Sequence, residues 1–155
     1  MVCKGVKNIE NHEIELLQLK SKVNADRIFF NVYGDATKDS GFKSLIEFDE
    51  MQVDSGVGKN FNLKTGEFKV PRKGTYEFSF SAGSCYQPTD IGIQKNGVTK
   101  LQLTNRGTGS SNQHIPISSN WLMNLDKGDR IQLKVIVGHV DSQSRIFTGK
   151  LLSYV

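Results

Sequence analysis

The chain has 155 residues, of which 37% are hydrophobic and 23% charged, as expected for one globular domain with its own core. Its formal charge of +4 and its pI of about 9.1 favour anionic partners, without choosing among nucleic acid, acidic glycans and phospholipid headgroups. No stretch approaches the roughly 18 apolar residues of a membrane span. Two cysteines without a CxxC motif argue against a zinc ribbon, a thioredoxin-like site and a disulfide framework.

The first predicted element is a helix over residues 6–24, which contain no glycine or proline and are rich in Glu, Leu, Lys and Gln. Its apolar residues follow a heptad pattern with the polar His12 at one d position, and Ile14 and Leu17 lie off this seam. The seam residues are Ile9, Leu16, Leu19 and Val23. Alone, so short a helix is marginal in water. We therefore expect residues 1–26 to form a stalk that is stabilised by sister helices or packed against a domain.

The N-terminal segment leaves several alternatives open. It lacks the apolar core of a signal peptide, so a cytosolic protein and a fragment without its leader would read alike. Cys3 could join chains in an oxidising compartment or remain a free thiol. His12 at a d position would make assembly sensitive to pH, because histidine titrates near pH 6.5.

From Arg27 onward the apolar period becomes two, which predicts a β domain over residues 27–155. Asn96-Gly97 between alternating strands indicates a type I′ hairpin turn, and Thr65-Gly66 indicates another tight turn. Roughly eight to ten short strands at turn spacings near ten residues predict an antiparallel sandwich or jelly roll. Single strands are predicted in 27–34, 75–84, 118–125, 130–138 and 144–155, one or two short strands in 41–56, and turn-linked strands in 60–70 and 91–103.

The clearest strand, residues 75–84, alternates apolar and polar side chains. Tyr76, Phe78 and Phe80 share one face and are expected in the core, where each contributes roughly 1.5–3 kcal/mol by burial. The strand therefore carries structure and no catalytic group.

A search for catalytic patterns yields no constellation. There is no G-x-S-x-G elbow and no H-x-x-x-H motif, and an all-β chain lacks the strand-to-helix turn that the elbow needs. Pairing Cys85 with His114 or His139 would rest on chance proximity. We therefore expect the chain not to be an enzyme.

Two acidic clusters bear on calcium, namely Asp49, Glu50 and Asp54, and the pair Asp126 and Asp129. Neither has EF-hand spacing. Aspartates in such turns usually cap backbone amides with their side chains, and this is the expected role.

A short basic run, Lys69, Arg72 and Lys73, surrounds a proline turn. Nearby aromatic residues are predicted to face the core, whereas single-stranded nucleic acid needs outward aromatics beside basic groups. A nucleic-acid partner is therefore not expected.

Several motifs in one order resemble the signature of the C1q globular domain family over about residues 27–155. The segments GEFKVPRKGTYEFSF, IQKNG, LDKGDRIQLKV and FTGKLL are similar to the family pattern in kind and order. One interval, from Asp54 to Phe61, is two residues longer than usual and suggests a longer loop. The matching single positions are Phe48, Asp54, Phe61, Phe68, Gly74, Tyr76, Phe78 and Phe80.

The resemblance implies a ten-stranded jelly roll of the C1q and tumour-necrosis-factor type, assembled as a homotrimer behind a collagen or coiled-coil stalk. No Gly-X-Y tract occurs, so the helix over 6–24 would be the stalk. Some family members bind calcium through acidic loops near the top of the trimer, but the loop over 104–117 holds no Asp or Glu. We expect no cofactor, with calcium left open.

The resemblance also implies a function. We expect a secreted, non-enzymatic homotrimer that binds anionic or glycan ligands of microbial surfaces in lectin-like innate recognition, or a protein receptor, through its loops. The alternative is an intracellular oligomerisation or interaction domain of the caprin-like type. Loop position and charge select the candidate ligand-binding residues, which are Arg72, Lys73, Arg106, Asn112, His114, Lys127, Arg130 and Arg145.

Overall fold

The computed structural model describes residues 3–25, 27–34, 44–55, 60–84, 88–106, 115–141 and 145–153. Within these residues one helix precedes ten strands. The elements are α1 (Cys3–Ala25), β1 (Phe29–Gly34), β2 (Glu50–Asp54), β3 (Phe61–Asn62), β4 (Glu67–Lys69), β5 (Gly74–Ser84), β6 (Thr89–Lys95), β7 (Val98–Asn105), β8 (Ile115–Leu125), β9 (Arg130–Val137) and β10 (Arg145–Ser153).

The strands form two antiparallel sheets of five strands each, which confirms the predicted jelly-roll sandwich. One sheet, called here the β1 sheet, has the order β2-β1-β10-β5-β8. The other, called the β6 sheet, has the order β3-β4-β9-β6-β7. Neighbouring strands are mostly distant in sequence, so each sheet forms only when remote segments of the chain meet.

An aromatic cluster fills the space between the sheets. The predicted core residues Tyr76, Phe78 and Phe80 are 0%, 0% and 1% exposed. The Phe30 ring comes from β1 of the same sheet and meets Phe68 of the opposite sheet, with a distance of 4.7 Å between the ring centroids. Phe30 reaches this position because Gly149 has no side chain, since a Cβ there would lie 2.3 Å from the Phe30 ring.

The two predicted tight turns are both present. Asn96 and Gly97 have φ angles of 54° and 81°, as a type I′ turn between β6 and β7 requires. Gly66, between β3 and β4, has a φ of 63°, and a Cβ there would lie 2.0 Å from the carbonyl oxygen of Ile46. Both hairpins therefore depend on residues that tolerate positive φ.

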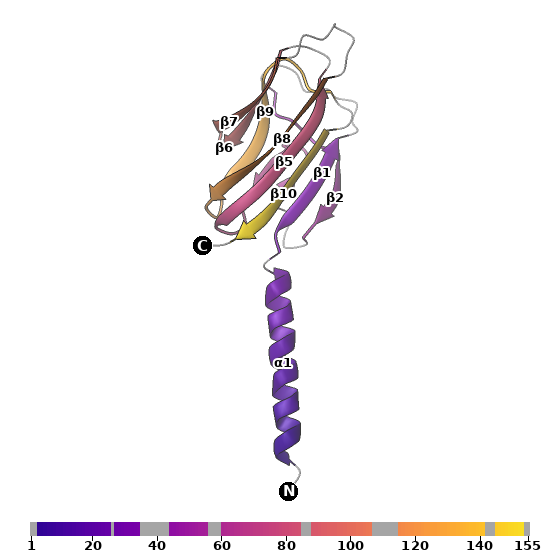
Figure 1. Cartoon of the computed structure of the whole chain (residues 1–155), viewed down its shortest axis with the longest axis vertical. Helices are drawn as coiled ribbons and strands as arrows, with labels where there is room; N and C mark the ends of the chain where they lie inside the picture. The colour runs from indigo at the N-terminus through magenta and orange to yellow at the C-terminus, as the bar shows by residue number, and fades with distance from the viewer. Residues whose placement is uncertain are drawn as a thin grey trace.

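The helix α1 extends away from one end of the sandwich, below the point where β1 begins (Figure 1). All of its side chains that the structure describes, over residues 8–23, are exposed. No helix in the described part of the chain is long and apolar enough to cross a membrane.

Candidate binding and assembly surfaces

Four of the candidate ligand-binding residues gather at the end of the sandwich nearest to α1 (Figure 1). Arg72 and Lys73 lie in the bend before β5, while Lys127 and Arg130 lie in and after the turn that joins β8 to β9. These turns lie at the same end of the sandwich because β5 begins there and β8, which runs antiparallel to it, ends there. This group is called the basic end.

A partly exposed network of an ion pair and hydrogen bonds holds the basic end together around Asp129. Its carboxylate lies 2.9 Å from the Lys95 ammonium, and it accepts hydrogen bonds of 2.8 Å from the Asn96 side chain and the Asp126 amide. Burial alone would raise the pKa of Asp129, but the hydrogen bonds from Lys95, Asn96 and the Asp126 amide outweigh it and hold the pKa below its usual value. The network ties the β6–β7 hairpin to the β8–β9 turn.

The acidic clusters considered for calcium are engaged by donors of the protein itself. Asp126 pairs with Lys73 at 3.1 Å, and Glu50 accepts hydrogen bonds from the Tyr33 hydroxyl and the Gln52 amide. The expected capping role is confirmed for Asp129, which accepts a backbone amide. Among the described residues, no three His, Cys, Asp or Glu side chains come together as a metal site would need.

The remaining candidate ligand-binding residues lie elsewhere. Arg106 follows β7 at the far end of the sandwich, where its Nη2 donates a hydrogen bond of 3.0 Å to Asp90 Oδ2 and its Nη1 forms an ion pair of 2.9 Å with Oδ1. Asp90 is 4% exposed, so this fork pairs a surface cation with a buried anion. Asn112 and His114 lie outside the described residues.

The prediction that Arg145 belongs to an exposed loop is wrong. Arg145 is the first residue of β10 and is 1% exposed. It shares the inward face of β10 with Phe147, and its side chain lies over Gly34, where a Cβ would be 2.3 Å from the Arg145 Nε. A surface ligand does not reach it, and its role is to fill and order the far end of the sandwich.

His139 also lies at the far end, in a polar cluster. Its Nδ1 is 3.5 Å from Asp141, and the Thr89 hydroxyl donates to its backbone carbonyl oxygen. Ser84 and Thr89 share a hydrogen bond of 2.7 Å. This cluster joins the ends of β5, β6 and β9, whereas Cys85, once considered as a partner for histidine, lies outside the described residues.

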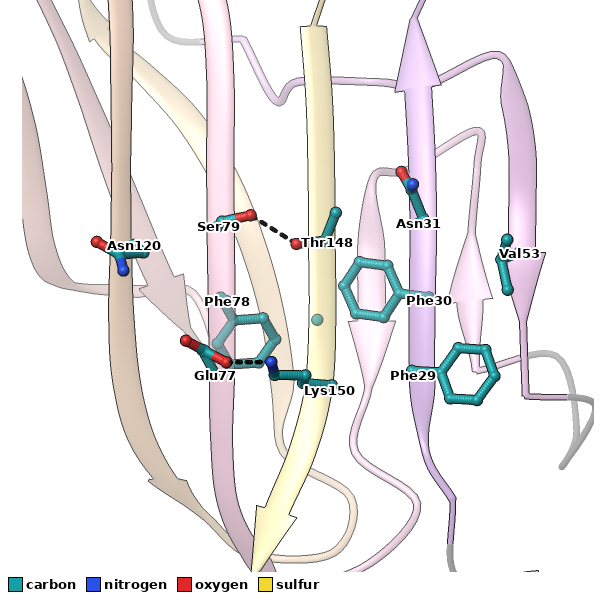
Figure 2. Close-up of a pocket in the computed structure, with 11 residues that line it drawn as sticks. Phe29, Phe30, Asn31, Val53, Glu77, Phe78, Ser79, Asn120, Thr148 and Lys150 are labelled. Atoms are coloured by element: carbon teal, nitrogen blue, oxygen red, sulfur yellow. Dashed lines mark hydrogen bonds and ion pairs between the residues drawn. The ribbon is translucent and has the colours of Figure 1, made fainter. Parts of the chain in front are cut away.

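A groove of about 430 Å³ crosses the outward face of the β1 sheet, and sequence reasoning missed it. Figure 2 shows two interactions along it, a hydrogen bond of 2.6 Å between Ser79 and Thr148 and an ion pair of 2.6 Å between Lys150 and Glu77. The polar alternation of residues 75–84 indicated only that this face is hydrophilic. The concave shape depends on β1 and β2, which flank the groove on the other side.

That other side of the groove is more apolar. Phe29 and Val53 stand on β1 and β2, with Asn31 beside them (Figure 2). The Asn31 side-chain oxygen is buried and has no hydrogen-bond partner within the part of the chain that the structure describes. A buried acceptor without a donor costs roughly 1–3 kcal/mol, so this wall is suited to receive a donor from another molecule.

The sandwich is open along the edge between β7 and β8. Leu101 pairs with the core residue Ile93 and so faces inward, yet it is 41% exposed. Val98 and Leu122 on the same two strands are 56% and 59% exposed. Val98 and Leu101 of β7 are called the open edge, whereas Leu122 pairs with Glu77 and so stands on the outward face of the β1 sheet.

The stalk presents a second apolar surface. Its predicted seam residues, Ile9, Leu16, Leu19 and Val23, are between 54% and 62% exposed. In a parallel coiled coil, the g position of one helix faces the following e position of its neighbour. Here that rule pairs Glu15 with Lys20 of a sister helix, an attractive combination.

Comparison with known proteins adds the decisive observation on family. A model of the C1q domain matches residues 20–152. The chain belongs to the C1q domain family. This C1q domain includes the last turns of α1, and its family is non-enzymatic.

Relatives and solved structures agree with this C1q assignment. Protein HP-25 homolog 1 of Bos taurus is 26% identical over 98 residues, which cover 61% of this chain and 45% of that protein, so the chain spans less than half of its length. The globular domain of zebrafish complement 1qA has a TM-score of 0.69 at 21% identity, covering 83% of this chain and 99% of that one. Eiger TNF from S. frugiperda has a TM-score of 0.66 at 12% identity and covers 84% and 95%. These likenesses show a shared fold.

Proposed function

We propose that this C1q domain protein is a homotrimeric recognition module that binds anionic or glycan surface ligands. The observation that carries the proposal is the stalk, whose described side chains are all exposed although they include an apolar seam. A helix of this length with a bare apolar seam gains its stability from sister helices. In-register helices place three globular domains side by side.

The globular domain offers surfaces that fit such an arrangement. The open edge and the groove lie on different parts of one copy, so an edge-to-groove contact is heterologous and closes only as a ring. A ring of three buries the open edge of each copy against the Phe29 and Val53 wall of the next. The unpartnered Asn31 oxygen then lies within a subunit contact.

A trimer also explains how a shallow surface achieves useful affinity. Three identical weak sites on one rigid body engage a repetitive surface with a high effective concentration. Proteins of this family are typically secreted. We therefore infer an extracellular module that recognises repetitive ligands, with the basic end as its main candidate contact.

The test is the mass in solution, measured by light scattering on a size-exclusion column. The expected mass is three times the 17.3 kDa of the chain. Leu16→Asp places a charge in the apolar seam of the stalk, and Leu101→Asp places one in the open edge. Each variant should shift the mass toward that of a monomer. Gln18→Asp, on the same helix but off the seam, is the matched control and should remain trimeric. A monomeric wild-type chain would contradict the proposal.

A further inference from the structure

Lys69 and the basic-end residue Arg130 face each other, and neither has a counter-ion among the described residues. Lys69 on β4 and Arg130 on β9 are directly opposite in the strand register, and both are exposed. Directly opposite residues have Cβ atoms roughly 4.5–5.5 Å apart, and like charges in this arrangement are destabilising. A single anion placed between them would remove the repulsion and gain two charge-assisted contacts.

The nearby carboxylates do not neutralise this pair. Asp126 is engaged with Lys73 at 3.1 Å, and Asp129, the residue before Arg130, is engaged with Lys95 at 2.9 Å. Within the described residues, neither member of the pair lies within 4.0 Å of a carboxylate oxygen.

Lys127 adds a third cation to this pair. It stands exposed in the turn before Arg130, and it too has no ion-pair partner within the described ranges. The three side chains Lys69, Lys127 and Arg130 are called the cation triad.

The triad lies where a ligand can reach it in an assembled trimer. β4 and β9 belong to the β6 sheet, whereas the groove lies on the outward face of the β1 sheet. The two sheets turn their outward faces in opposite directions. The open edge lies on β7, at the other side of the β6 sheet from β4, so an edge-to-groove assembly leaves the triad exposed.

The surroundings of the triad favour a carbohydrate over a nucleic acid. The strands of the β6 sheet contain two aromatic residues, Phe61 and Phe68, and both are buried. No base-stacking platform is therefore present on these strands. The outward face instead carries Gln132 and Lys134 along β9, which offer further donors to hydroxyl and acidic groups in line with Arg130.

We propose that the cation triad binds the sulfate and carboxylate groups of an acidic polysaccharide. The Arg130 guanidinium matches two oxygens of one sulfate, and the two lysines act as point charges on neighbouring groups. The inference deepens the proposed function and rests on it for avidity, because three triads on one trimer hold one long polymer. The single-site contact does not depend on assembly.

The experiment measures binding of a fluorescent heparin fragment at physiological salt. The Lys69→Gln/Arg130→Gln variant should weaken binding at least tenfold, which corresponds to about 1.4 kcal/mol. The matched control, Lys22→Gln/Lys100→Gln, removes the same charge from exposed positions on the stalk and β7, and its binding should stay close to wild type. Light scattering first verifies that the variants and the wild type have the same oligomeric mass, so that their affinities can be compared.

Three results would overturn the inference. Wild-type trimer could fail to bind the heparin fragment, the control could lose as much affinity as the triad variant, or a single-stranded oligonucleotide could bind more tightly through the same residues. The first result leaves the trimer intact and so counts against the triad alone. Triad-dependent binding by a monomer would instead support the triad and contradict the trimer.

Discussion

Gly149→Ala tests whether the aromatic core is as tightly filled as the structure indicates. The added Cβ would lie 2.3 and 2.7 Å from two atoms of the Phe30 ring and 2.9 Å from the Phe78 ring. Neighbouring rings restrict the movement of Phe30, since its centroid is 4.8 Å from that of Phe61 and 5.1 Å from that of Phe147. Overpacking of this kind costs about 1–3 kcal/mol. For a chain of this size we expect Tm to fall by roughly 3–10 °C.

The assay is urea unfolding at one fixed protein concentration, because oligomer stability depends on concentration. Thr148→Ala, on the outward face of the same strand, is the control and should cost less. In the Gly149→Ala/Phe30→Leu double variant, the smaller side chain makes room for the new methyl group. Its loss should be less than the sum of the single losses by about 1 kcal/mol or more. Additive losses would refute the argument that the glycine exists to admit the Phe30 ring.

Three further predictions follow from single groups. Asp129→Asn should lower the free energy of unfolding at pH 7, and the difference from wild type should vanish in acid. The depressed pKa of Asp129 stabilises the folded protein above the unfolded value of 3.8, and this contribution is lost as the pH falls through the folded pKa. Urea unfolding of both proteins at pH 7 and in acid measures the difference. Burial raises the pKa of Tyr76 to about 12, so its contribution to folding stability is complete below pH 10.0 and is lost as the pH rises toward 12. Tyr76→Phe should therefore abolish the absorbance step near pH 12 in a tyrosine titration. Arg145→Ala should cost about 2–4 kcal/mol in urea unfolding by emptying the space over Gly34, while the milder Arg145→Met should leave heparin binding unchanged; a loss of binding in a stable Arg145→Met protein would contradict its burial.

Local features were predictable because they depend on neighbours in sequence. The predicted helix over 6–24 contains no breaker, and α1 includes this range and extends it to Cys3, through Gly5, and to Ala25. The Asn96-Gly97 turn needs only two residues that tolerate positive φ. For the region 41–56 the sequence predicts one or two short strands, and its described residues form one, Glu50–Asp54, with an isolated bridge at Leu45.

The burial of a charged side chain was less predictable, because its charge indicates the surface whatever its place in the fold. Arg145 follows a loop and carries a charge, so its sequence context indicates the surface. Its burial depends on Gly34 of β1, a residue far away in the chain that leaves room for the guanidinium stem. The role of Asp129 was predictable, because its capping of a backbone amide follows from the turn over residues 126–129 that the sequence predicts.

The sequence by itself determined the secondary structure, the aromatic core strand and the family motifs, since each depends on short-range periodicity or on turn residues. Only the tertiary structure decided which charges meet. The opposition of Lys69 and Arg130 exists because β4 pairs with β9, and the groove exists because β1 and β2 flank β10 and β5. Pairing between distant strands is selected by the packing of the whole core, and no local stretch of sequence contains that information.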